Sequence, residues 1–217
     1  AVQESSDEVQ DMKLVWTYDC NPPEYRTPAG VVVDYYDGDK RKKDGLNQDD
    51  ETYVGPSQVI ATPVFHDGRV YVAIGQDPAH GNGKGMLHCI DPSLTGDITE
   101  SGCIWKYTDI QRTMSTVAVK DGAVYVPDVT GKVHSVDAKT GQRRWLFDMD
   151  NETWGGVLVA DDKLYVGNKS YFYILADGAE PKVLSKARLR QPAYSTPVVA
   201  NGKLYVASQR YLWAVER

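Results

Sequence analysis

The chain has 217 residues, 41% of them hydrophobic, and this composition is typical of a globular protein that buries a substantial core. Its formal net charge of −6 argues against a sequence-independent nucleic-acid binder, which needs a basic face. No apolar run approaches the roughly 18 residues of a transmembrane helix, and the polar tail at 1–11 is not a signal peptide, although it fits the remainder of a cleaved one.

After this tail, residues 12–18 are predicted to form a single outer strand without a hairpin of its own. The segment carries Trp16 and Tyr18 in a pattern that recurs later in the chain, first as Trp105–Tyr107 and then as Trp145–Phe147. Residues 19–57 follow as a long polar loop or insertion, because their basic DKRKKD run is flanked by acids that cancel its charge.

The rest of the chain, 58–217, repeats one hairpin pattern four times. Each copy is an apolar strand, a two-residue turn and a second strand that contains Tyr-Val. The turn pairs are Asp67-Gly68, Asp121-Gly122, Asp161-Asp162 and Asn201-Gly202. Asn-Gly and Asp-Gly between alternating strands are strong hairpin signals, because both central residues of a type I′ turn need positive φ.

A third strand follows each hairpin, and a fourth strand follows in all copies but the last. The fourth strands are CIWKYTD, RRWLFDMD and KVLSKARL, and the last of these lacks the Trp. Four-stranded antiparallel units of about 40 residues are typical of β-propeller blades. The sequence therefore predicts an all-β propeller with about four blades, at 58–110, 114–150, 154–190 and 194–217.

Two of the repeated segments resemble a known family. VHSVDAKTGQRRW at 133–145 and TPVVANGKLYVAS at 196–208 are similar to the repeat of the PQQ-like (quinoprotein alcohol dehydrogenase-like) β-propellers. The resemblance covers most of 58–217 together with 12–18. It implies that Trp16, Trp105 and Trp145 dock one blade against the next and have a structural role. Gly141 fits the left-handed position of the turn before Trp145.

Propellers of this family usually have seven or eight blades, so the resemblance leaves three arrangements open. The preferred one is the C-terminal half of a larger ring, in which a missing N-terminal half supplies the other blades. A half-ring that pairs with a second copy as a homodimer is another, and a small four-bladed ring closed by 12–18 is the third. An isolated half-ring would expose two apolar sheet faces, which monomers rarely tolerate.

Candidate ligand-binding residues are few. Asp77, His80 and Asn82 lie in a glycine-rich loop and could offer donors to a metal ion, although their spacing matches no standard calcium loop. Trp154 could face the central channel and bind a cofactor, or it could pack between blades. Cys89 and Cys103 are expected on adjacent antiparallel strands, where a disulfide could join them in an oxidising compartment.

The function favoured by these observations is a non-catalytic binding or scaffold protein that recognises a protein, peptide or glycan on the propeller face. The alternative is part of a PQQ-dependent alcohol or sugar dehydrogenase, with PQQ and calcium as cofactors. The resemblance implies adjacent cysteines near the cofactor of such an enzyme, and the chain has no Cys-Cys pair. The resemblance also implies a periplasmic or extracellular location.

Overall fold

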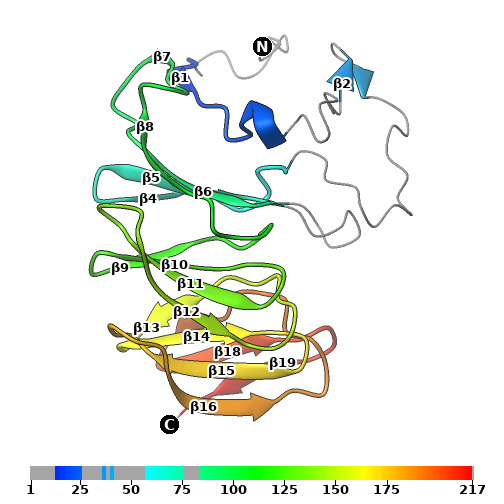
Figure 1. Cartoon of the computed structure of the whole chain (residues 1–217). Coiled ribbons are helices and arrows are strands. Elements are labelled where there is room, and N and C mark those ends of the chain that lie inside the picture. The colour runs from blue at the N-terminus through cyan, green and yellow to red at the C-terminus, as the bar shows by residue number, and fades with distance from the viewer. Residues whose placement is uncertain (1–12, 26–35, 38–39, 42–56, 76–83, 217) are drawn as a thin grey trace.

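The fold is a stack of antiparallel β-sheets. The computed structural model describes residues 13–25, 36–37, 40–41, 57–75 and 84–216. Figure 1 shows the cyan and green first sheet above the green second sheet, and the second above the yellow third, with the red fourth sheet overlapping the third in this view. Within the described ranges the helical content is one 3-10 turn, η1 (Pro23–Tyr25), and no helix is long and apolar enough to span a membrane.

Three sheets have four antiparallel strands and a fourth sheet has three, in the strand order of the chain. The first contains β4 (Val64–His66), β5 (Arg69–Ile74), β6 (Met86–Ile90) and β8 (Cys103–Tyr107). The second contains β9 (Ala118–Lys120), β10 (Ala123–Pro127), β11 (Lys132–Asp137) and β12 (Arg143–Asp148). The third contains β13 (Leu158–Ala160), β14 (Lys163–Gly167), β15 (Tyr171–Ala176) and β16 (Lys182–Arg188). The fourth contains β17 (Val198–Ala200), β18 (Lys203–Ala207) and β19 (Leu212–Val215). The predicted all-β propeller fold is confirmed, and these sheets are called the first to fourth blades.

The four hairpin turns have the backbone conformation that their sequences predict. Residues of all four predicted turn pairs have positive φ, including Asp161 at 51° and Asp162 at 52°, the pair that has no glycine. Asp tolerates the left-handed region better than most residues, since its short polar side chain can hydrogen-bond locally. Each turn therefore fixes the register of the strands on either side of it.

The second and third blades each bury one face against the blade before and the other against the blade after, because side chains alternate along a strand. One core cluster joins Tyr71 and Trp105 of the first blade to Val124 and Val136 of the second. The next cluster joins the second blade, through Tyr125, Val133 and Trp145, to the third, through Leu164, Val166, Tyr173 and Leu175.

Trp105 and Trp145 occupy equivalent places on the fourth strands of the first two blades. The indole Nε1 of Trp105 donates a hydrogen bond to the Ala138 carbonyl oxygen at 3.1 Å, and that of Trp145 donates to the Gly178 carbonyl oxygen at 3.0 Å. Gly141 has a φ of 74°, and a Cβ there would lie 2.7 Å from Cδ2 of Trp105. The turn of the second blade therefore needs glycine both for its backbone and for the indole of the first.

Residues 13–18 lie against the face of the first blade that points away from the second blade. β1 (Trp16–Thr17) pairs in parallel with β7 (Gly96–Asp97), and Trp16 and Tyr18 pack on a small cluster around Val72, Ile90 and Ile98. Thus the segment joins no four-stranded sheet among the described residues, and its role as the outer strand of a further blade stays a prediction.

Cys20, Cys89 and Cys103 are all free thiols, so the expected Cys89–Cys103 disulfide is not formed. The reason is the register of the two strands. Cys89 pairs with Trp105, whereas Cys103 pairs with Ile90 across a bulge. Cys89 therefore faces the second blade with Trp105. Cys103 pairs with Ile90, which packs on the opposite side of the sheet.

Most of the predicted loop at 19–57 lies outside the described residues. Its described part holds η1 and a two-stranded sheet of β2 (Tyr36–Asp37) and β3 (Lys40–Arg41). The metal-site candidates Asp77, His80 and Asn82 also lie outside the described residues.

Candidate functional site: the loop face

One end of the blades gathers the loops that carry the candidate site. Here the connections between blades, at 108–117, 149–157 and 189–197, meet the loops between second and third strands. Backbone hydrogen bonds tie the two kinds of loop together: Lys169 N donates to the Glu152 carbonyl at 3.0 Å and Gln209 N to the Pro192 carbonyl at 3.1 Å. We call this end the loop face.

An aromatic pair lies on the loop face. Trp154 and Tyr194 precede the inner strands of the third and fourth blades, and their rings stack with centroids 4.3 Å apart and an interplanar angle of 10°. Trp154 remains 36% exposed. The pair therefore offers an apolar contact surface to solvent while each ring supports the other.

Polar neighbours hold the aromatic pair in place. The Tyr194 hydroxyl donates a hydrogen bond to Glu152 Oε1 at 2.8 Å, and Lys169 Nζ lies 3.3 Å from the same oxygen. Burial, followed by the hydrogen bond to the Glu152 carboxylate, raises the pKa of Tyr194 to about 12. The hydroxyl therefore stays protonated and keeps donating throughout the neutral range.

Two glycines bring the connections close enough for this stacking. A Cβ on Gly155 would lie 2.8 Å from the Ser195 carbonyl, and one on Gly156 would lie 2.6 Å from the Thr116 carbonyl oxygen. Gly156 N also donates to Thr196 Oγ1 at 2.9 Å. The sequence TWGG thus sets Trp154 beside Tyr194, since larger residues after the Trp would push the chains apart.

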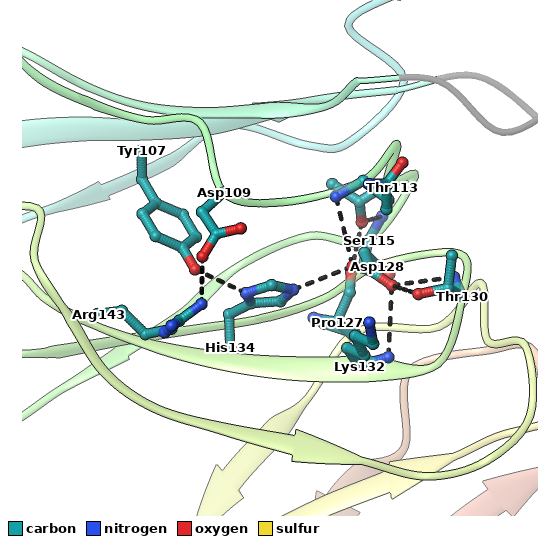
Figure 2. Close-up of polar contacts among 11 residues, drawn as sticks. Tyr107, Asp109, Thr113, Ser115, Pro127, Asp128, Thr130, Lys132, His134 and Arg143 are labelled. Carbon is teal, nitrogen blue, oxygen red and sulfur yellow. Dashed lines mark hydrogen bonds and ion pairs between the residues drawn. The ribbon is translucent and has the colours of Figure 1, made fainter.

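Below the loop face, a buried polar chain links the first two blades (Figure 2). His134 Nε2 lies 3.0 Å from Asp128 Oδ2, and the Tyr107 hydroxyl lies 2.9 Å from His134 Nδ1. Because a carboxylate only accepts, a neutral His134 that donates from Nε2 and accepts at Nδ1 satisfies all three groups. The side chains of Asp128 and His134 are only 1% and 2% exposed.

Asp128 also holds the loop that follows it through hydrogen bonds. Its Oδ1 accepts hydrogen bonds from the Thr130 hydroxyl at 2.6 Å, from the Thr130 amide at 2.9 Å and from the Lys132 amide at 3.3 Å. Burial alone would raise the pKa of Asp128, but the hydrogen bonds from His134 and Thr130 outweigh it and lower that pKa. Nearby, Arg143 and Asp109 form an ion pair on the surface.

Asp128, His134 and Tyr107 are arranged in series like an acid–base relay, but they are hydrogen-bonded to one another and their side chains are buried. A relay that acts on substrate must place its terminal group within reach of that substrate. This chain therefore stabilises the junction of two blades. The aromatic pair, by contrast, reaches the surface and can make contacts with a ligand.

The residues near the aromatic pair do not supply a ligand set for the calcium ion of the alternative prediction. The described part of the chain contains no group of three or more His, Cys, Asp or Glu that could hold a metal ion. Glu152, the carboxylate beside Trp154, is already bonded to Tyr194 and Lys169. No redox step through PQQ and calcium is therefore assigned to this site.

Sequence reasoning singled out Trp154 but not Tyr194 or Glu152. The structure places Trp154 partly exposed beside Tyr194, in the connection to the inner strand of its blade. A signal for Tyr194 was present, because ETWGG and PAYST occupy the same place in consecutive repeats. Recognising it requires aligning the connections as well as the strands.

The stacked blades and their connections define this molecule as a β-propeller built from PQQ-like repeats. A sequence profile of the family described as "Outer membrane protein assembly factor BamB" matches residues 13–146 and 129–217. The chain belongs to this family.

Individual relatives agree with this assignment. The outer membrane protein assembly factor BamB of Burkholderia pseudomallei (strain K96243) is 38% identical over 93 residues, which cover 42% of this chain and 24% of that protein. The crystal structure of BamB from Moraxella catarrhalis matches with a TM-score of 0.52 and 18% identity, over 70% of this chain and 41% of that one. The chain thus corresponds to less than half the length of either relative.

Other solved structures share the fold. The quinohemoprotein alcohol dehydrogenase ADHIIG from Pseudomonas putida HK5 has a TM-score of 0.55 and 18% identity, over 70% of this chain and 28% of that one. The computationally designed Ika4 protein has a TM-score of 0.57 and 11% identity, over 73% of this chain and 92% of that one. At these identities the likeness concerns the fold alone.

Proposed function

We propose that the chain is part of a non-catalytic periplasmic scaffold that binds a polypeptide segment of another protein during assembly of outer-membrane proteins. The observation that carries the proposal is the exposed Trp154–Tyr194 stack on the loop face. Family membership supplies the context, since the matching family is described as an assembly factor for outer-membrane proteins.

The Trp154–Tyr194 pair is suited to contact a peptide. Trp and Tyr give large contact areas and lose little side-chain entropy, so they dominate the binding energy of many interfaces. Here the two rings are already stacked, and Glu152 holds the Tyr194 hydroxyl before any ligand binds. This preorganisation reduces the entropic cost of binding.

A binding titration tests the proposal. The probe is a set of synthetic peptides taken from the strands of an outer-membrane β-barrel protein, titrated by fluorescence anisotropy. We expect Trp154→Ala to weaken binding at least tenfold, as the loss of a central aromatic residue does at other interfaces. Phe65→Ala is the matched control, because Phe65 is 68% exposed but lies beside a hairpin turn at the other end of its blade.

Two results would contradict the proposal. One is a dissociation constant for Trp154→Ala equal to that of the wild type. The other is binding that depends on Trp154 but is obtained with oligosaccharides and with none of the peptides. Tyr194→Phe separates the ring from its hydroxyl, and we expect only a small loss there because the stack is retained.

We also propose that further blades, in a longer polypeptide or in a second copy, cover the two ends of the stack. The support concerns the end beside the first blade and comes from a repeated contact. The Tyr18 hydroxyl lies 3.1 Å from His88 Nδ1 with the rings 5.5 Å apart, and Tyr107 and His134 make the same contact at 2.9 Å and 5.6 Å. Tyr107 belongs to the outer strand of the preceding blade, so Tyr18 takes the place of an outer-strand residue.

A further inference from the structure

At the junction of the third and fourth blades, the fourth strand of the third blade lacks the aromatic side chains that the earlier fourth strands contribute to their junctions. In the second blade Trp145 pairs with Ser135, and Phe147 pairs with Val133. In the third blade the corresponding pairs place Ser185 opposite Ile174 and Ala187 opposite Phe172. The third blade therefore has a hydroxymethyl and a methyl group where the second has an indole and a phenyl ring.

A cavity of about 700 Å³ lies where those rings would be. Phe172 and Ile174 of the third blade form one wall, and Val206 and Trp213 of the fourth form the other. Ser185 and Ala187 also line it and are exposed, so the cavity opens to solvent. Its volume and its apolar walls are those of a small-molecule site.

The charged residues of the lining are of one sign. Arg188 and Arg190 both line the cavity, and its lining contains no Asp or Glu. Neither arginine forms an ion pair with another residue in the part of the chain that is described. Guanidinium groups pair well with carboxylates, so the site favours an anionic ligand over a neutral one of the same shape.

We propose that this cavity binds a small aromatic carboxylate, with its ring in the space of the missing indole and its carboxylate toward the arginines. An indole suits a space of this kind, because Trp145 occupies the equivalent place one blade earlier, with its ring centroid 5.7 Å from that of Tyr125. The cavity is separate from the Trp154–Tyr194 pair, so the proposal does not rest on the proposed function.

Calorimetric titration with indole-3-acetate as the probe tests this proposal. We expect saturable one-to-one binding, and at least fivefold weaker binding of 3-methylindole, which keeps the ring but has no carboxylate. Ser185→Trp should abolish binding, because its own indole fills the cavity. Val183→Trp is the matched control: Val183 lies on the same strand but pairs with Leu175 on the opposite face, and this variant should bind as the wild type does.

Ala187→Phe provides a second way of filling the cavity if Ser185→Trp does not fold, and circular dichroism establishes folding for each variant. Both filled variants should also unfold at a higher temperature than the wild type. Wild-type protein that does not bind indole-3-acetate at 10 mM, or binding that persists in the folded filled variants, overturns the proposal. Equal affinity for 3-methylindole and indole-3-acetate overturns the role of the arginines.

Discussion

His88 should make the stability of this protein sensitive to mildly acidic pH. The imidazole is buried in the first blade, and its Nδ1 is hydrogen-bonded to the Tyr18 hydroxyl at 3.1 Å. Burial, assisted by the positive charge of Lys106, lowers the pKa of His88 from its ordinary 6.5 to about 4, against smaller opposing effects that include Asp19. His88 is therefore neutral in the folded protein at pH values where the unfolded chain already binds a proton.

The magnitude follows from this difference in pKa. The unfolded state takes up one more proton than the folded state between pH 6.5 and about 4. Each pH unit in that range lowers the free energy of unfolding by about 1.4 kcal/mol, so the full loss is about 3 kcal/mol. The contribution of His88 is fully present above pH 6.5 and is lost as the pH falls toward 4.

Urea denaturation at half-unit steps from pH 7.5 to 4 measures this effect. Between pH 7.5 and 4, the free energy of unfolding of His88→Phe should fall by about 3 kcal/mol less than that of the wild type. At pH 7.5 the variant should be less stable than the wild type, because Tyr18 loses its hydrogen-bond partner. His66→Gln, at an exposed residue, is the control and should keep the wild-type slope. If His88→Phe keeps the wild-type pH dependence, His88 is not the source of the acid sensitivity.

Three further predictions concern the packing between blades. Gly141→Ala should lower the free energy of unfolding by about 3 kcal/mol, because the backbone is strained and the added methyl meets Trp105. Gly122→Ala should lower it by only about 1 kcal/mol, because there is open space around its added methyl. Equal losses for the two variants in urea denaturation would contradict the role of the Trp105 contact. Asp128→Asn should cost about 2 kcal/mol at pH 7 by weakening its bonds to His134. The pKa of Asp128 is lowered in the folded protein, so this contribution to stability is fully present above the ordinary pKa of 3.8 and is lost as the pH falls through the pKa of the folded state. Thermal scans should therefore show the melting temperatures of mutant and wild type converging at low pH. Light scattering after size exclusion should show self-association of the isolated chain, and a clean monomer at micromolar concentration would count against a second copy as the cover of its ends.

Much of the fold could be predicted from the sequence because it is determined locally. The Asp-Gly and Asn-Gly turns give the hairpins, and the alternating strands beside them give the faces. The prediction of a Cys89–Cys103 disulfide was wrong, since a bulge between Cys89 and Ile90 sets the register of the fourth strand and places the two thiols on opposite faces. Sequence spacing does not reveal such a bulge.

The candidate sites depend on contacts between repeats, which are harder to predict. Trp154 stood out by its type, but its stacking on Tyr194 depends on two connections that meet only in the folded stack. Similarly, the sequence shows that KVLSKARL lacks a Trp, yet neighbouring side chains could have closed the space. The structure shows that they do not, and that a cavity remains beside Ser185.

The most direct test of a peptide-binding loop face is to identify which surface of the protein touches the partner. A photo-reactive phenylalanine analogue is placed at position 154 on the loop face, or at position 65 near a hairpin turn, and cross-linked to an unfolded outer-membrane β-barrel protein. We expect a strong cross-link from position 154 and little or none from position 65. Equal cross-linking from both positions, or cross-linking from position 65 alone, would contradict it.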